Sequence, residues 1–147
     1  KGCIFCKLLR REIPSWIINQ NDKFAAFLTP FPNTPGVTVV IPKEHKYDYV
    51  FDMNDEDYCE YLKYIKTVVN RIDKVFGVSR TAMVFEGTQI SHVHAKIFPL
   101  HGFLGGSTDV ESQEKEFVEE YRGFLTTHGG PKMDDKKLDE LRDKLKF

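Results

Sequence analysis

The run Val37–Ile41 constrains the fold most, because every one of its residues is β-branched. Branched side chains fit the pleated surface of a sheet, and an unbroken run of them is typical of a strand covered on both faces. Pro42 follows and should end the strand, since proline has no N–H to donate to a neighbouring strand. We therefore expect a sheet with this segment at its centre.

Four further strands are predicted around the central one. The apolar runs Trp16–Ile18 and Phe24–Leu28 are separated by the turn-forming residues 19–22, a pattern that indicates a hairpin. Two more strands are expected over Thr81–Phe85 and His92–Phe98, joined by a connection short enough for a second hairpin.

A long amphipathic helix is predicted between the two groups of strands. Asn54 can cap its beginning, and Gly77 stands where a left-handed terminator belongs. Its apolar stripe repeats at intervals of three and four residues, the spacing of one helical face. Cys59 is expected on the buried side. The stripe consists of Tyr58, Leu62, Ile65, Val69, Ile72 and Phe76.

Shorter helices are expected near both ends of the chain. They cover Ile4–Arg11, Glu111–Phe124 and Asp134–Leu145, while the prolines of Thr29–Gly36 indicate an irregular, stiff loop. This order of elements predicts an α+β fold with a largely antiparallel five-stranded sheet and flanking helices. We expect one domain over residues 1–147, with a core of about 1–100 and a helical extension of about 101–147.

The bulk properties exclude several classes of protein. A chain of 147 residues fits one domain, and its net charge of −1 gives no field that would attract nucleic acid or an anionic membrane. No apolar stretch approaches the ~20 residues of a membrane span, and the first residues lack a secretory core. A cytoplasmic protein without a membrane or nucleic-acid partner is predicted. Three cysteines favour a thiolate site over a disulfide framework.

The segment His92-Val93-His94-Ala95-Lys96 carries the reactive groups. Strand alternation places His92, His94 and Lys96 on one face, which then needs anions, a metal or solvent. Attack on phosphorus suits this array, because a neutral imidazole is a good nucleophile near pH 7 and a good leaving group once phosphorylated. Candidate donors to the phosphate oxygens are Lys96, Thr88, Gln89 and Ser91.

Five segments occur in a fixed order over roughly residues 1 to 100: Cys3–Lys7, Glu12–Ser15, Phe24–Leu28, Thr34–Gly36 with Val39–His45, and His92–His94. Together they resemble the histidine-triad (HIT) superfamily of nucleotide hydrolases and transferases. The resemblance implies an α+β sheet fold, a homodimer, a purine nucleotide or nucleotide conjugate as ligand, and cleavage of nucleoside phosphoramidates or dinucleoside polyphosphates. It implies that His94 attacks the α-phosphate and that His92 orients it through its backbone carbonyl.

Two positions depart from the family pattern. Lys96 stands where the family has a third histidine, which contacts the phosphate or the leaving group. A lysine can neutralise phosphate charge but is a poor proton donor at neutral pH. Other branches carry glutamine there, so transferase activity stays open. Thr29 stands where an aspartate or asparagine would bind the ribose hydroxyls, and a threonine can make only one such hydrogen bond.

The pair Cys3 and Cys6 has metal-ligand spacing, although two cysteines on a short helix can also be simply buried. Bacterial-type members of the superfamily hold zinc with such a pair and two histidines, which implies His45 and His92 here. Two thiolates and two imidazoles form a closed, structural zinc site.

Two alternatives stay open beside the hydrolase or transferase. One is a catalytically slow, zinc-stabilised nucleotide-binding module; the other, less favoured, is an open catalytic metal held by His45, His92 and His94. Phe103, Phe124 and Trp16 are expected in the core or in a dimer contact rather than as base-stacking platforms, although one of them could line a nucleobase pocket. His101 and His128 are expected to be solvated.

Overall fold

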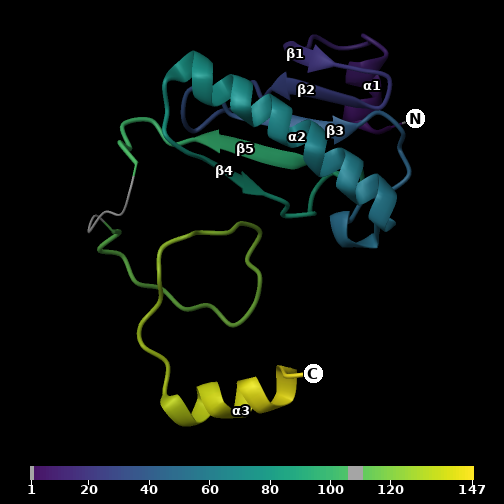
Figure 1. Ribbon diagram of the computed structural model, residues 1–147. Helices are drawn as coiled ribbons and strands as arrows, with labels where there is room; N and C mark the ends of the chain where they lie inside the picture. The colour runs from purple at the N-terminus through teal and green to yellow at the C-terminus, as the bar shows by residue number, and fades with distance from the viewer. Residues whose placement is uncertain (1, 106–110) are drawn as a thin grey trace. The chain divides into compact units, whose positions relative to one another are not determined.

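The computed structural model describes residues 2–105 and 111–147. Its sheet has five strands in the order β1-β2-β3-β5-β4, and every neighbouring pair is antiparallel. The predicted α+β fold is therefore confirmed (Figure 1). The strands are β1 (Ile17–Gln20), β2 (Phe24–Leu28), β3 (Thr38–Pro42), β4 (Thr81–Val84) and β5 (Ala95–Pro99).

The middle strand β3 is buried along its whole length, as the β-branched run predicts. Val40 belongs to the core between the sheet and the helix α2 (Asp55–Phe76), which runs across one face of the sheet (Figure 1). Val39 and Ile41 belong to a second core with Phe5 and Leu8 of the short helix α1 (Ile4–Leu9). The two cores cover opposite faces of the same strand, because successive side chains of a strand alternate.

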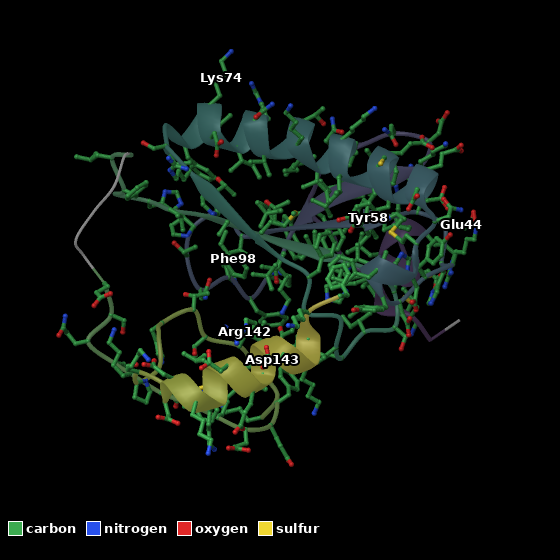
Figure 2. All side chains as sticks on the ribbon, turned by 60° about the horizontal axis from the view of Figure 1, so that its bottom comes forward. Glu44, Tyr58, Lys74, Phe98, Arg142 and Asp143 are labelled. Atoms are coloured by element: carbon green, nitrogen blue, oxygen red, sulfur yellow. The ribbon has the colours of Figure 1, made fainter. Side chains whose placement is uncertain are left out.

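The ends of α2 are those that the sequence predicts. The side chain of Asn54 accepts a hydrogen bond of 2.8 Å from the backbone N–H of Asp57, and Gly77 adopts a left-handed φ of 65°. Tyr58 packs against the core, whereas Lys74 near the other end points away from the sheet (Figure 2).

The burial of Cys59 is a wrong prediction, because its side chain is exposed. The buried face of α2 is centred on Tyr61, Ile65, Val68 and Ile72. At 3.6 residues per turn, Cys59 lies about 120° around the helix from Ile65. The expected stripe was therefore slightly rotated from the observed one, and Phe76 at its end is exposed.

The contacts of the chain divide it into two units, residues 1–105 and 106–147. The second unit contains the predicted last helix as α3 (Asp135–Leu145), but the helix expected over Glu111–Phe124 is absent from the described residues of that range. Its apolar residues Phe117 and Val118 are exposed, so they supply little of the packing that a helix marginal on its own would need.

Two further expectations concern His128 and the extent of the C-terminal extension. His128 is not solvated, since its ring lies within 3.6 Å of a Glu116 carboxylate oxygen and its side chain is only 15% exposed. Residues 106–110 of the expected extension lie outside the described residues, and the single-domain organisation stays a prediction. None of the described helices has the length and apolarity to cross a bilayer.

Candidate functional site

The two histidines of the motif lie just before β5, because the pairing of β5 with β3 begins only at Ala95. The N–H of Val93 donates instead to the carbonyl of Tyr47 at 2.9 Å, so the strand starts three residues later than predicted. The predicted alternation nevertheless holds. Val93 and Ala95 enter the core under α2, while His92 and His94 contact the opposite core.

Phe5 of α1 packs against both imidazole rings. Its ring centroid lies 5.7 Å from that of His92 and 5.1 Å from that of His94, both in edge-on geometry. His92 is fully buried and His94 is 6% exposed. The N-terminal helix therefore closes one side of the histidine pair.

Two backbone carbonyls determine which nitrogen of each ring carries the hydrogen. Nδ1 of His94 lies 2.8 Å from the carbonyl oxygen of His92, and Nε2 of His92 lies 2.7 Å from that of Pro42. A carbonyl can only accept, so each of these nitrogens donates, and in a neutral ring the other nitrogen has a free lone pair. For His94 this is Nε2, and for His92 it is Nδ1.

The surroundings of His94 favour its neutral form. Burial lowers the pKa of His94, and the nearby charge of Lys96 lowers it further, against the raising effects of the His92 carbonyl and Glu86. A ring with a pKa below its ordinary value is neutral near pH 7, as a nucleophile must be.

His94 and Lys96 line a cavity of about 490 Å³. Its walls are mostly apolar and come from α1, β2, β3 and the proline-rich loop after β2. A largely apolar cavity with a few polar groups beside a candidate nucleophile is typical of a small-molecule site. The polar side chains that line it, other than His94 and Lys96, are Thr29, Asn33 and Gln89.

The predicted nucleotide-binding residues are only partly brought together. Thr29 and Gln89 line the cavity, whereas Thr88 and Ser91 do not, and the roles of all four stay predictions. The Thr29 hydroxyl accepts a hydrogen bond of 3.2 Å from the N–H of Phe31, within its own loop. Gln89 has a left-handed φ of 71°, which costs energy for a residue with a side chain and marks this loop as tightly held.

Sequence reasoning missed three residues around the cavity. Trp16 is not in the core: it is 52% exposed and lines the cavity, as Asn33 does. Glu86, only 14% exposed in its side chain, lies with Oε1 3.5 Å from Nζ of Lys96. The prolines around Asn33 indicated a shaped loop in the sequence. No sequence periodicity indicates the places of Trp16 and Glu86, because these depend on residues that are distant along the chain.

A larger cavity of about 660 Å³ lies between α2 and the β1–β2 side of the sheet. Asn19, Thr67 and Arg71 are among its lining residues, but its described lining contains no histidine or cysteine. It offers no nucleophile of the imidazole or thiol type, so the smaller cavity at His94 is the candidate active site.

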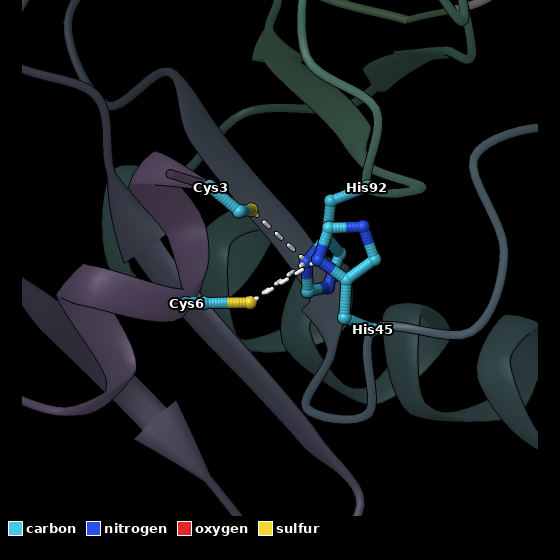
Figure 3. Close-up of side chains that lie close together, drawn as sticks. All are labelled: Cys3, Cys6, His45 and His92. Carbon is cyan, nitrogen blue, oxygen red and sulfur yellow. Dashed lines mark hydrogen bonds between the residues drawn. The ribbon is translucent and has the colours of Figure 1, made fainter. Parts of the chain in front are cut away.

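The second cluster of functional groups joins Cys3, Cys6, His45 and His92, whose ligand atoms lie within 4.8 Å of one another (Figure 3). Nδ1 of His92 is 3.5 Å from Sγ of Cys3 and 3.7 Å from Sγ of Cys6, and Nδ1 of His45 is 3.3 Å from Sγ of Cys6. A tetrahedral zinc with ordinary bond lengths separates sulfur and nitrogen ligands by roughly 3.5 Å.

The hydrogen bonding of His92 also suits a metal. Because its Nε2–H is bonded to Pro42, the lone pair of Nδ1 faces the two sulfur atoms. His94 does not belong to the cluster, so the described residues do not assemble the open site that His45, His92 and His94 would form.

The HIT domain family matches residues 10–103 of the sequence. This span is well over half of the 147 residues, and the chain therefore belongs to the HIT domain family. The histidine-triad resemblance of the sequence is thereby confirmed.

Named relatives agree with this membership. An uncharacterised HIT-like protein of Methanocaldococcus jannaschii is 32% identical over 101 residues, which cover 66% of this chain and 78% of that protein. The adenosine 5'-monophosphoramidase hnt1 of Schizosaccharomyces pombe is 31% identical over 99 residues, covering 67% and 74%. A HIT family structure from Bacillus subtilis has a TM-score of 0.68 at 24% identity, covering 99% of this chain and 95% of that chain, and shows the shared fold.

Proposed function

We propose that the protein hydrolyses or transfers a nucleoside monophosphate group through a covalent intermediate on His94. The single observation that carries this proposal is the 2.8 Å hydrogen bond from Nδ1 of His94 to the His92 carbonyl. It leaves the lone pair of Nε2 available on a residue that lines the cavity. Nucleophilic catalysis by imidazole requires this fixed tautomer.

The reaction has two balanced steps. In the first, Nε2 of His94 forms a bond to the α-phosphorus, while the bond to the leaving group breaks and its electron pair departs with that group. A phosphate departs as the anion, whereas an amine takes up a proton from solvent. In the second, water or another acceptor attacks phosphorus, the N–P bond breaks, and the acceptor releases its proton to solvent. Lys96 is placed to offset charge on the phosphoryl oxygens.

A purine nucleotide conjugate is the proposed substrate. One relative carries the name adenosine 5'-monophosphoramidase, and the cavity combines apolar walls with the polar groups of Thr29, Asn33 and Gln89. Nucleoside phosphoramidates and dinucleoside polyphosphates both fit this chemistry. The rival is a slow nucleotide-binding module, in which Lys96 and Thr29 would record lost activity. The Thr29 hydroxyl accepts one hydrogen bond within its own loop, which leaves its O–H free to donate to a ribose hydroxyl.

We also propose that Cys3, Cys6, His45 and His92 hold a structural zinc ion. When bound, the metal would link α1 to the residues after β3 and before β5, and with four protein ligands it would be closed to substrate. His92 then orients His94 with its carbonyl while its ring is held by the metal.

A homodimer is the third proposal. In the described sheet, β4 pairs only with β5, so its outer edge offers unpaired N–H and carbonyl groups, and Met83 in it is 45% exposed. An apolar edge strand can pair with the same strand of a second copy around a two-fold axis.

The catalytic proposal is tested by His94→Ala on an adenosine phosphoramidate and a diadenosine polyphosphate. The parent should turn over at least one of them, and kcat should fall by at least about a hundredfold, because the nucleophile is lost. Lys66→Ala is the control, since Lys66 is exposed on α2 and does not line the cavity, and this variant should keep its activity. Binding of nucleotide without turnover by the parent would favour the binding module instead.

Metal content tests the zinc site. Protein purified without chelator should hold about one equivalent of zinc, and Cys6→Ser should lose most of it and melt at a lower temperature. Cys59→Ser changes an exposed cysteine outside the cluster and should keep the metal. Parent protein with less than about half an equivalent, by elemental analysis, would contradict the four-ligand site.

Sedimentation tests the dimer. A charge on the edge strand, in Met83→Lys, should shift the parent dimer toward monomer, because lysine at an exposed edge opposes strand pairing. Ile18→Lys places the same charge on β1, the opposite edge of the sheet, and should leave the dimer intact. A monomeric parent, or dissociation only by Ile18→Lys, would refute pairing through β4.

A further inference from the structure

Lys96 and Glu86 form an ion pair at the edge of the His94 cavity. Nζ of Lys96 lies 3.5 Å from Oε1 of Glu86, and the carboxylate is the more buried partner, with its side chain 14% exposed against 36% for lysine. Lys96 lines the cavity with His94. Lys96 is therefore part of the site, and Glu86 contacts it without lining the cavity.

The backbone places this pair at a fixed distance from the nucleophile. Residues two apart on an extended segment share a face and lie roughly 7 Å apart, so the Lys96 side chain starts beside the ring of His94. Lys96 is paired with Val84 of β4, and Glu86 follows Val84 by two residues. The carboxylate thus approaches from the neighbouring strand and limits the freedom of a long side chain that would otherwise extend to water.

An ammonium in this position suits one kind of leaving group. It has three N–H donors, so contact with one carboxylate still allows it to donate to phosphate oxygens. A phosphate group can depart as a stable anion without taking up a proton. An amine must be protonated as it departs, and a lysine ammonium holds its proton tightly at neutral pH.

We propose that Lys96, positioned by Glu86, makes this site selective for substrates whose leaving group departs as a phosphate anion, such as dinucleoside polyphosphates, over phosphoramidates. This inference rests on the proposed attack by His94 and names the substrate class of that site. When Nε2 bonds to phosphorus, the bridging P–O bond breaks and its electron pair stays on the departing phosphate oxygen. Lys96 stabilises that negative charge and transfers no proton.

The test compares kcat/KM for diadenosine tetraphosphate and adenosine 5'-phosphoramidate, which share the adenylyl group. The parent should favour the tetraphosphate by at least about tenfold. Lys96→Met should lower kcat/KM for the tetraphosphate by about tenfold or more and that for the phosphoramidate by less, since only the tetraphosphate has a phosphate leaving group. Lys96→His should raise phosphoramidate turnover, since an imidazolium can donate a proton near pH 7. Glu86→Gln should lower the ratio of kcat/KM for the tetraphosphate to kcat/KM for the phosphoramidate, as Lys96→Met does. If Glu86 had a purely structural role, its loss would not change this ratio.

Lys66→Met is the matched control, because Lys66 is exposed on α2 and should leave the ratio unchanged. The proposed selectivity would be overturned if the parent favoured the phosphoramidate, or if the variants changed kcat/KM equally for both substrates. In either case, turnover that depends on His94 would still support the proposed function. Turnover that survives His94→Ala would instead overturn the proposed function.

Binding of inorganic pyrophosphate provides a readout that needs no turnover. Calorimetry should show that Lys96→Met weakens pyrophosphate binding by about tenfold, whereas Lys66→Met has no effect. Equal binding by the parent and Lys96→Met, or no binding by the parent, would overturn the role of Lys96 as an anion site.

Discussion

The hydrogen bond from Nδ1 of His94 to the carbonyl of His92 is the interaction on which the account of this site depends. It joins residues only two apart, yet it determines which ring nitrogen faces the cavity. His92 takes part twice, since its carbonyl orients His94 while its own ring is oriented by the Pro42 carbonyl at the end of β3. Two ordinary backbone acceptors thus leave a free lone pair on Nε2 of His94, which lines the candidate cavity, and direct the lone pair of His92 Nδ1 toward two sulfur atoms.

The sheet makes this arrangement possible by separating two cores. The core under α2 takes Val93, Ala95 and Ile97, so the intervening histidines must face the other side. There Phe5 of α1 touches both rings, and Cys3 and Cys6 approach from the same helix region. The N-terminal helix, although only 6 residues long, therefore packs against the candidate nucleophile and also contributes to the proposed metal site.

The strands, the long helix and the two faces of the histidine segment were predictable because each depends on local periodicity or on a capping residue. Val37–Ile41, Asn54 and Gly77 are examples in which a short pattern specifies the outcome. Burial of Cys59 failed because a modest rotation of the helical stripe moves a residue at its margin into solvent. The helix over Glu111–Phe124 failed because propensity without a packing partner does not stabilise a helix. Glu86, Asn33 and Trp16 could not be assigned to the site, since their places depend on how separate segments meet in the fold.

The proposed reaction requires that Nε2 of His94 becomes covalently bonded to phosphorus. The most direct measurement is peptide mapping by mass spectrometry of a reaction stopped under alkaline conditions, which preserve a phosphorus–nitrogen bond, during the first turnover of a diadenosine polyphosphate or an adenosine phosphoramidate. We expect an adenylyl adduct on the peptide that contains His92 and His94, assigned by fragmentation to His94, and this adduct should form and decay at rates that match product release. Turnover without any adduct, or an adduct located on another residue, would contradict the proposed reaction.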